Sequence, residues 1–262
     1  IMCGITGYWN LRADESAEAM QARITPMANS MFLRGPDSGG AWISPGVGLA
    51  LGHRRLAIVD LSPAGHQPMS TADGRYTICY NGEVYDSSPL RQELMEMGVV
   101  FRGTSDTEAL LYGCAILGIE ATISRLTGMF AFAFWDSREK VLTLVRDRLG
   151  VKPLYWAKFD SLILFGSELK PLVAHPGWPQ EINRDAIAGL VDLCYSPAPI
   201  SIYKEVYKLR PGHLLEFRQD GSVHDRCWWE PLDILLEGKA NQLKAGEEEL
   251  VDQLDALLRD AI

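Results

Sequence analysis

A cysteine close to the amino terminus, Cys3, is followed by Gly4. If a free α-amino group adjoins this thiol, nucleophile and base lie in one residue, because an α-amine with a pKa of about 7.7–8.0 can accept the thiol proton near neutral pH. A cysteine activated in this way can attack an amide carbonyl, and the small Gly4 lets a substrate approach closely. The alternative is a buried cysteine without a chemical role, so Cys3 needs support from other residues.

The tripeptide Asn81-Gly82-Glu83 offers such support, because attack on an amide requires donors for the developing oxyanion. The side-chain amide of Asn81 and the backbone N–H of Gly82 can both donate, and we place them at the end of a strand. The alternative is a hairpin turn, for which Asn-Gly is the commonest signal.

Charged residues that could hold the two ends of an amino acid also occur. An arginine grips a carboxylate with two parallel hydrogen bonds, and neighbouring strand residues point to opposite sides, so at most one of Arg54 and Arg55 faces a site. Asp106, in the expected first turn of a helix, could bind an ammonium group. The alternatives are a solvated strand edge for the arginines and a routine helix-terminal charge for Asp106.

Several other chemistries lack their residues. The five histidines are scattered without the spacing of a zinc site, so we expect no metal ligands. No Gly-rich loop ends in Gly-Lys-Ser/Thr, and no Ser occupies a Gly-x-Ser-x-Gly elbow with suitable partners. Ser38-Gly39-Gly40 is interpreted as structural because Ala41-Trp42 follow it. These absences favour a terminal amine as the base.

Composition indicates a soluble globular protein. Of 262 residues, 47% are hydrophobic and 23% charged, and the net charge of −9 argues against nucleic-acid binding. No apolar run reaches the roughly 18 residues of a membrane span, and no secretory signal is seen, so we expect a cytoplasmic location. The cysteines are odd in number and unclustered, which predicts reduced, mostly buried thiols at Cys79, Cys114, Cys194 and Cys227.

Short strands are expected to carry these residues, at 47–53, 56–59, 76–80, 129–136 and 141–145. The strand at 129–136 is the clearest. Phe130, Phe132 and Phe134 share one face, and the other face is also apolar, with Ala131, Ala133 and Trp135. Such a strand lies between two layers and does not face water.

Helices are expected between and after these strands. Ser88-Pro89 predicts one helix start, and Ser105 with Glu108 has capping-box spacing for a second. Asn183 is a candidate cap for a third, and leucines recur at helical spacing over 250–258. Strand pairs with interspersed helices predict an α+β layered sandwich with helices outside.

The composition shifts near 233–248, where glycine, lysine, asparagine and glutamine indicate a linker. We therefore assign 1–232 to one domain and 233–262 to a linker and the first helix of a further domain.

In combination, the segments closely resemble the glutaminase domain of glutamine-hydrolysing asparagine synthetases, a class II amidotransferase domain of the N-terminal-nucleophile type. The resemblance runs from Met2 to about Trp228 and rests on the number and order of its motifs. They are Cys3-Gly4-Ile5, Arg34-Gly35-Pro36-Asp37, His53 with Arg55-Leu56, Asn81-Gly82-Glu83, Ser105-Asp106-Thr107-Glu108, and the runs at 128–133, 146–155, 167–170 and 208–213.

The resemblance implies a four-layer αββα sandwich and a specific reaction. Cys3 would attack the side-chain amide of L-glutamine, release ammonia and leave a glutamyl thioester that water hydrolyses to glutamate. Asn81 and Gly82 would hold the oxyanion.

The same resemblance implies how the substrate is held. Arg55 would bind the α-carboxylate of glutamine, and Asp106 with Gly82 or Glu83 would bind its α-amino group.

It also implies a partner. In this family ammonia passes to a C-terminal synthetase domain of the same protein, a ligase domain of amino-acid biosynthesis that uses ATP and Mg²⁺. The Ser-Gly-Gly-x-Asp-Ser loop of that domain is not in this sequence, so no cofactor is expected in this chain. Aspartate or another carboxylate would accept the ammonia, and dimerisation is compatible with the family.

Three departures from the family pattern stand out: Leu33 replaces a usual His, Asp86 replaces a common Asn, and Ile1-Met2 precede Cys3. A peptide-bonded Cys3 has no free amine, so we expect poor or no activity while Ile1-Met2 remain attached. Two alternatives stay open: a non-catalytic or regulatory domain of the same fold, and a stand-alone amidohydrolase with another amide substrate.

Overall fold

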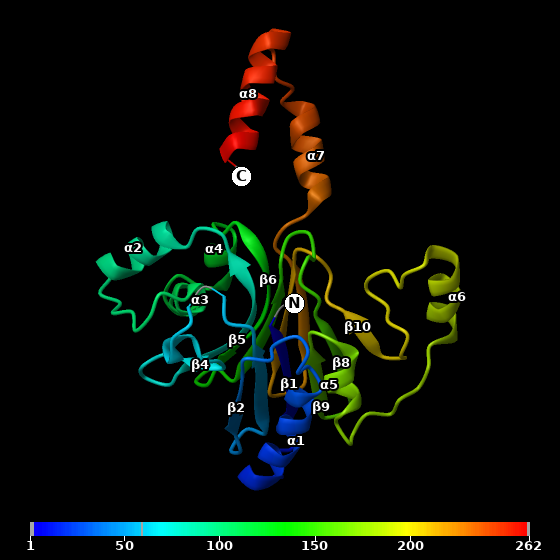
Figure 1. Ribbon diagram of the computed structural model, residues 1–262. Helices are drawn as coiled ribbons and strands as arrows, with labels where there is room; N and C mark the ends of the chain where they lie inside the picture. The colour runs from blue at the N-terminus through cyan, green and yellow to red at the C-terminus, as the bar shows by residue number, and fades with distance from the viewer. Residues whose placement is uncertain (1–2, 59, 261–262) are drawn as a thin grey trace. The chain divides into compact units, whose positions relative to one another are not determined.

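The computed structural model describes residues 3–58 and 60–260 (Figure 1). The chain divides into two compact units, with the division between Trp229 and Glu230. The first unit contains two six-stranded sheets. The first sheet has the strand order β10 (Val206–Lys208), β8 (Tyr155–Phe159), β9 (Leu162–Gly166), β1 (Gly4–Asn10), β3 (Leu49–Arg55) and β2 (Ser38–Ser44).

The second sheet carries the doubly apolar strand predicted from the sequence. Its order is β12 (Val223–Cys227), β11 (His213–Arg218), β7 (Val141–Arg146), β6 (Gly128–Asp136), β5 (Tyr76–Val84) and β4 (Met69–Ser70). The three phenylalanines of β6 pack into a cluster with the helices, whereas Ala131, Ala133 and Trp135 pack against the other sheet. The prediction that β6 is buried on both faces is therefore confirmed.

Aromatic and aliphatic side chains of both sheets form the central core. Trp9 of β1 and Trp135 of β6 meet edge to face, with ring centroids 5.1 Å apart, and both are fully buried. Leu51, Phe165 and Phe217 belong to the same cluster. This shared interior fixes the two sheets face to face. Cys3, just before β1 of the first sheet, and Asn81, on β5 of the second, therefore line the same cavity.

Helices cover both outer faces. On the second sheet lie α2 (Ser88–Glu96), α3 (Asp106–Ile116) and α4 (Ile119–Ile123), whereas α1 (Ala17–Asn29) and α5 (Leu169–Val173) pack on the first. The order helix, sheet, sheet, helix confirms the predicted four-layer αββα sandwich. A further helix, α6 (Arg184–Leu193), belongs to an excursion between β9 and β10 (Figure 1).

Several predicted strands have different bounds. The strand expected at 76–80 continues to Val84, so Asn81 and Gly82 lie inside it and not at its end. The strand expected at 47–53 runs from Leu49 to Arg55, because a turn with Gly48 at a φ of +74° precedes it. The strand expected at 56–59 is wrong for residues 56–58, and residue 59 lies outside the described residues. The pairing partners end first, since Arg54 pairs with Gly4 and Arg55 with Ser38.

The predicted helix starts are largely confirmed. Asn183 caps α6 by accepting from the N–H groups of Asp185 and Ala186. The helix predicted with Ser88 as its cap starts one residue earlier, with Ser87 as the cap and Ser88 as the first helical residue. Ser105 caps α3, but the expected capping box is not closed as predicted. The Glu108 carboxylate instead accepts from backbone N–H groups of the preceding loop, at Arg102 and Gly103.

The second unit is a pair of helices, α7 (Pro231–Ala240) and α8 (Glu247–Asp260). The expected linker at 233–248 is therefore helical up to Ala240, because Glu230 and Pro231 start a helix there. The helix predicted over 250–258 is confirmed. Neither helix has a buried residue, although both carry several leucines.

Among the described residues, no helix is both long enough and apolar enough to cross a membrane.

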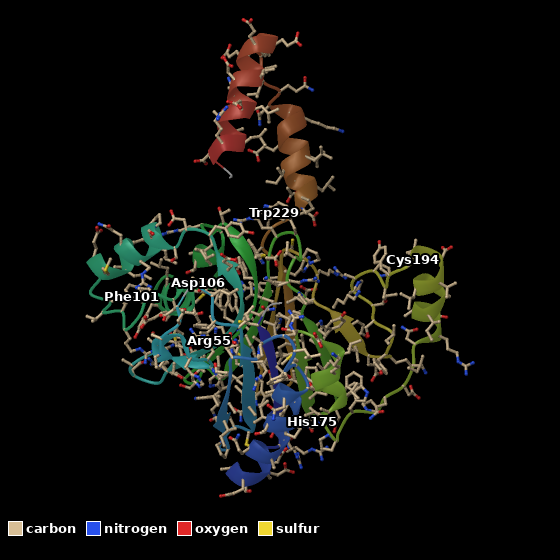
Figure 2. The ribbon with its side chains drawn as sticks, viewed as in Figure 1. Arg55, Phe101, Asp106, His175, Cys194 and Trp229 are labelled. Atoms are coloured by element: carbon tan, nitrogen blue, oxygen red, sulfur yellow. The ribbon has the colours of Figure 1, made fainter. Side chains whose placement is uncertain are left out.

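The cysteines do not all behave as predicted. Cys79 and Cys114 are buried, but Cys194 and Cys227 are exposed. Cys194 follows the last residue of α6 in the left-handed conformation, with a φ of +60° (Figure 2). Cys227 ends β12, the outermost strand of its sheet. Their positions at element ends explain the exposure, which the residue type alone does not predict.

Candidate active site

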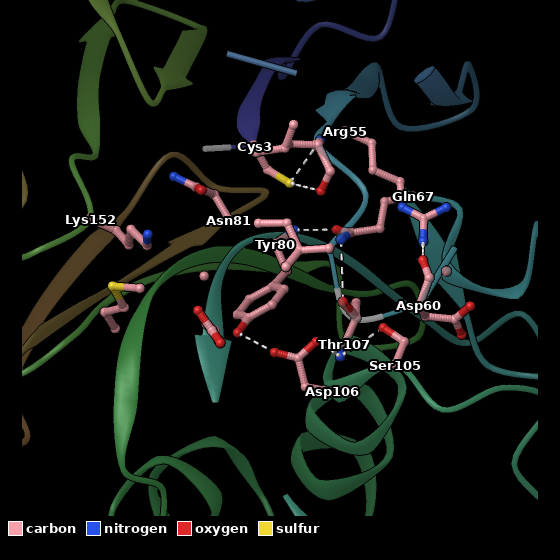
Figure 3. A pocket seen from close by; sticks show the side chains of 16 residues that line it. Cys3, Arg55, Asp60, Gln67, Tyr80, Asn81, Ser105, Asp106, Thr107 and Lys152 are labelled. Carbon is pink, nitrogen blue, oxygen red and sulfur yellow. Dashed lines mark hydrogen bonds between the residues drawn. The ribbon is translucent and has the colours of Figure 1, made fainter. Parts of the chain in front are cut away.

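A cavity of about 220 Å³ lies where the first residues of β1 approach the end of β5 (Figure 3). All six site residues predicted from the sequence line this one cavity: Cys3, Arg55, Asn81, Gly82, Glu83 and Asp106. They come from four separate segments of the chain, and the fold brings them together.

Cys3 immediately precedes β1 and is half-buried. Its Sγ lies 3.3 Å from the backbone N of Leu56, which donates to it, and 3.5 Å from the Leu56 carbonyl oxygen. Arg34 Nε donates to the Cys3 carbonyl oxygen at 2.9 Å and so holds the backbone. Burial raises the pKa of the Cys3 thiol. Among the described residues no side chain hydrogen-bonds to Sγ, so a base must come from elsewhere.

The edge of β5 that faces the cavity is only partly paired. On this edge β4 pairs with Ile78 and Thr77, and no described strand continues beyond them. Backbone N–H groups of alternate residues point to the same edge of a strand. The Tyr80 N–H donates to Gln67 Oε1 at 2.6 Å, and the Val84 N–H donates to Asp106 Oδ2 at 3.0 Å. The Gly82 N–H lies between them and faces the cavity.

The side chain of Asn81 points from β5 toward the first sheet. It shares a face with Cys79, which packs between the sheets, and therefore faces the sheet that begins after Cys3. Asn81 is 1% exposed, and its Nδ2 has no hydrogen-bond partner among the described residues. A buried donor without an acceptor costs free energy unless a ligand supplies one. The hairpin-turn alternative is wrong, because Asn81 pairs with Ala131 inside β5.

The two neighbouring arginines point to opposite sides, as predicted. Arg55 lines the cavity, and its guanidinium donates to the Ser62 carbonyl oxygen at 3.0 Å and to the Asp60 carbonyl oxygen. Arg54 instead donates to the Gly35 carbonyl oxygen at 2.9 Å. The loop after β3 thus folds back onto Arg55 and fixes its charged group at the cavity wall.

Asp106 is the first residue of α3, after the cap residue Ser105. Its Oδ2 accepts from the Tyr80 hydroxyl at 2.8 Å as well as from the Val84 N–H at 3.0 Å. Burial and the nearby carboxylate of Asp106 raise the pKa of Tyr80 well above its usual value, so this hydroxyl remains a donor. A carboxylate at a helix N-terminus is also favoured by the helix dipole. Asp106 is therefore a fixed negative charge in the cavity.

A buried histidine supports the same strand. His53 on β3 lies 3.1 Å, through Nε2, from the Tyr80 carbonyl oxygen. A carbonyl only accepts, so Nε2 carries the hydrogen. Burial lowers the pKa of His53 to about 3, so the ring is neutral near pH 7. His53 thus satisfies the carbonyl oxygen of Tyr80, while Gln67 satisfies its N–H.

Sequence reasoning missed several residues that line the cavity, among them Gln67, Tyr80 and Lys152. Lys152 is 3% exposed, and burial together with the nearby Arg34 charge lowers its pKa. The run at 146–155 is among the motifs of the family resemblance, but it carries no indication that Lys152 itself reaches the cavity.

Asp147 builds the loop that carries Lys152. Its buried carboxylate accepts hydrogen bonds from the backbone N–H groups of Phe130, Leu149, Val151 and Lys152, at 2.9–3.2 Å. These bonds fix the backbone at Lys152 and hence the position of that side chain at the cavity.

The described part of the chain contains no group of three or more His, Cys, Asp or Glu residues that could hold a metal ion.

Comparisons with known proteins agree with this arrangement. Residues 2–229 match the glutamine amidotransferase domain family. Asparagine synthetase 3 (glutamine-hydrolysing) of Bacillus subtilis is 41% identical over 232 residues, which are 87% of this chain and 36% of that protein. Asparagine synthetase 1 of the same organism is 35% identical and matches 100% of this chain and 39% of its own length. The chain thus spans little more than a third of these relatives.

Two further similarities are more distant. The amidase chry2 of Gibberella zeae is 30% identical over 275 residues, covering 100% of this chain and 39% of that protein. The structure of glutamine phosphoribosylpyrophosphate amidotransferase from B. subtilis aligns with a TM-score of 0.62 over 86% of this chain and 49% of that chain, at 19% identity. At that identity the alignment supports the fold alone. By its family match and its relatives, the chain belongs to the glutamine amidotransferase domain family.

Proposed function

We propose that this chain hydrolyses L-glutamine to glutamate and ammonia, with Cys3 as the nucleophile. The observation that carries the proposal is the buried side-chain amide of Asn81, which has no partner among the described residues and lines the same cavity as Cys3. An amide aimed into a cavity beside a thiol is what an acyl-transfer site needs for its oxyanion.

Charged groups at the cavity would hold the amino-acid end of the substrate. The Arg55 guanidinium would bind the α-carboxylate of glutamine, because both groups are planar and bidentate. The carboxylates of Asp106 and Glu83 would bind the α-ammonium group. Both ends of the substrate would then be fixed, which leaves the side-chain amide directed toward Cys3.

In the reaction, Sγ of Cys3 would form a bond to the amide carbon, and the carbonyl oxygen would take up the negative charge. Asn81 Nδ2 and the Gly82 N–H would donate to this oxyanion. The tetrahedral intermediate would then expel ammonia, which carries away the proton taken from the thiol, and leave a glutamyl thioester. Water would attack the thioester and release glutamate and the free thiol.

The base in this scheme would be the α-amino group of Cys3. Burial raises the pKa of the thiol, so a base is required near neutral pH. A free α-amine has a pKa of about 7.7–8.0 and lies in the same residue as the thiol. We therefore propose that the active form begins at Cys3, without Ile1-Met2.

We further propose that the ammonia is supplied to an ATP-dependent amidation domain. The names of the longer relatives, which join glutamine hydrolysis to asparagine synthesis, support this proposal. ATP and Mg²⁺ would belong to that domain, and aspartate or another carboxylate would accept the ammonia. The free thiols of the described cysteines are compatible with a cytoplasmic location.

The experiment is an assay of glutamate release from glutamine by a chain made to begin at Cys3. The controls are the same chain with Cys3→Ala and the chain that retains Ile1-Met2. We expect hydrolysis only from the first, with a loss of about a thousandfold or more in Cys3→Ala.

A folded chain beginning at Cys3 that releases no glutamate would contradict the proposal and favour a regulatory domain. Turnover of a different amide, with no competition by glutamine analogues, would favour a stand-alone amidohydrolase.

A further inference from the structure

Gln67 lies between the 3-10 turn η1 (Pro63–Gly65) and β4, and it lines the cavity while being only 5% exposed. Its backbone is packed tightly against the first sheet, since a Cβ at Gly40 of β2 would lie 2.0 Å from the Gln67 carbonyl oxygen. Gln67 therefore has little freedom to move, and its side-chain amide is held at one place in the cavity wall.

The side chain of Gln67 supplies the next hydrogen bond beyond the start of β4. The Thr71 N–H donates to the Tyr76 carbonyl oxygen and Met69 pairs with Ile78, so in the same register the next hydrogen-bonded position opposite Tyr80 would be residue 67. β4 begins only at Met69, so no strand backbone occupies that position. Gln67 Oε1 then accepts from the Tyr80 N–H at 2.6 Å, where a strand carbonyl would otherwise be needed.

The other half of the amide reaches the helix across the cavity wall. Gln67 Nε2 donates to Thr107 Oγ1 at 3.3 Å. The orientation of the amide follows from its partner, because the Tyr80 N–H can only donate and so requires the carbonyl oxygen. One side chain thus connects the residue before Asn81 to the residue after Asp106.

We propose that Gln67 is a positioning residue that sets the separation between the oxyanion donors on β5 and the Asp106 carboxylate on α3. This inference rests on the proposed glutamine hydrolysis. The separation between the two groups determines how long an amide-bearing amino acid can be and still engage both ends. Gln67 would therefore tune the cavity for the length of glutamine without touching the reacting atoms.

A second hydrogen bond between β5 and α3 makes the role of Gln67 testable. The Tyr80 hydroxyl also binds Asp106, at 2.8 Å, so loss of Gln67 would loosen the separation and not abolish it. The nucleophile Cys3 lies just before β1 of the other sheet, and its contacts are to Leu56 and Arg34. Loss of Gln67 should therefore affect recognition of glutamine but not the reactivity of Cys3.

The decisive variant is Gln67→Met, which keeps the size of the side chain and removes both hydrogen bonds. In the chain beginning at Cys3, we expect kcat/KM for glutamine to fall about 10- to 100-fold, as loss of buried hydrogen bonds would give. Inactivation by a diazoketone analogue of glutamine should slow by a similar factor.

Alkylation of Cys3 by iodoacetamide separates a loss of glutamine recognition from a general structural defect. A general defect would change the alkylation rate, whereas a loss of recognition would not. The alkylation is followed by mass analysis of the N-terminal peptide. The rate of Cys3 alkylation in Gln67→Met should stay within about twofold of the rate in the unsubstituted chain. The matched control is Gln92→Met, on the exposed face of α2, which should match the unsubstituted chain in every assay.

A second variant keeps the inference testable if Gln67→Met does not fold. Thr107→Val removes only the contact with Nε2, and Thr107→Ser keeps the hydroxyl. We expect Thr107→Val to lose part of the glutamine activity and Thr107→Ser to retain it. In the double variant Gln67→Met/Thr107→Val the losses should overlap, because both act on one connection.

The inference is overturned if folded Gln67→Met keeps kcat/KM for glutamine within about twofold, or if iodoacetamide and the diazoketone slow equally. Failure of the proposed function has a different signature. In that case the unsubstituted chain itself would neither hydrolyse glutamine nor react with the diazoketone at Cys3.

Discussion

The two halves of β5 differ in what lies along their outer edge. In the first half, Thr77 and Ile78 pair with β4 on one side and with β6 on the other. In the second half, from Tyr80 to Val84, β6 is the one strand partner among the described residues, and side chains occupy the other edge. One strand thus provides both a paired core segment and the wall of the candidate site.

The difference shows how a sheet edge becomes a binding site. Backbone N–H groups that are buried need acceptors, and an unpaired edge exposes a row of them. Along the second half of β5, Gln67 and Asp106 satisfy the N–H groups of Tyr80 and Val84, while the Gly82 N–H between them faces the cavity. Side-chain capping on both sides leaves one directed donor for a ligand.

At Phe130 of β6, just beyond the last residue paired with β7, the Asp147 side chain accepts from the backbone N–H while the Asp147 N–H donates to the Phe130 carbonyl oxygen. Replacing Asp147 with Ala removes the acceptor for the N–H groups of Phe130 and Lys152, among others. We expect the free energy of unfolding to fall by about 3–5 kcal/mol, because several buried donors lose their partner together. Urea denaturation measures the loss, and Asp147→Asn, which keeps one acceptor oxygen, should lose less. Equal stability of all three proteins would contradict this role of the Asp147 side chain.

Substitution in the paired half of β5 should affect stability and leave catalysis intact. Ile78 is fully buried, and Ile78→Ala should lower the free energy of unfolding by about 2–5 kcal/mol through the cavity it leaves. At a temperature where the variant is folded, kcat for glutamine hydrolysis should remain within about threefold of the unsubstituted chain. A tenfold or larger fall in kcat would show that the two halves of the strand are not separable.

Substitution at the open half should affect substrate binding. Asp106→Asn keeps an acceptor for the Tyr80 hydroxyl and the Val84 N–H but removes the negative charge. We expect KM for glutamine to rise about 10- to 100-fold with little change in kcat, because the charge acts on the bound amino group in ground and transition states alike. Steady-state kinetics provide the test. An unchanged KM would remove Asp106 from the binding residues.

The histidine behind the open half gives a pH dependence. The pKa of His53 is lowered to about 3 by burial, so the unfolded chain binds a proton more readily than the folded one. Its contribution to stability is present above the ordinary pKa of about 6.5 and is lost as the pH falls from there toward 3. Between pH 7 and pH 5 we expect this residue to cost about 2 kcal/mol of stability.

The matching variant is His53→Gln, whose side-chain N–H can still donate to the Tyr80 carbonyl oxygen. Urea denaturation at the two pH values should show a smaller loss in His53→Gln than in the unsubstituted chain. The remaining loss is expected from groups such as His175, whose pKa burial lowers to about 4. An identical pH dependence in both proteins would contradict the assignment.

Much of the fold and most of the site could be predicted because they follow from local pattern. The alternation along 129–136 shows two apolar faces, and that pattern alone requires layers on both sides of β6. Adjacent strand residues must diverge, which explains why only one of Arg54 and Arg55 reaches the cavity, whereas the choice of Arg55 came from the family resemblance. The six site residues formed a recognisable set through motif order, since no single motif among them was decisive.

What the sequence did not predict depends on tertiary neighbours. Gln67 matters because β4 begins only after it, at Met69, and leaves the Tyr80 N–H to a side chain, and no local sequence pattern shows where a partner strand stops. The apolar run at 56–58 has strand-like residues but pairs with no strand in the described part of the chain. Cys194 and Cys227 are exposed because of their places at element ends, which their residue type does not specify.

We propose that Asn81 serves to bind an oxyanion and does not stabilise the fold. One variant tests this through two measurements, kcat and the free energy of unfolding. Asn81→Leu has a similar volume but no donor. We predict that kcat for glutamine falls about 100- to 1000-fold, while the free energy of unfolding stays equal or rises by about 1 kcal/mol, since a buried unpartnered amide is removed. An unchanged kcat, or a stability loss of about 2 kcal/mol or more, would contradict the claim.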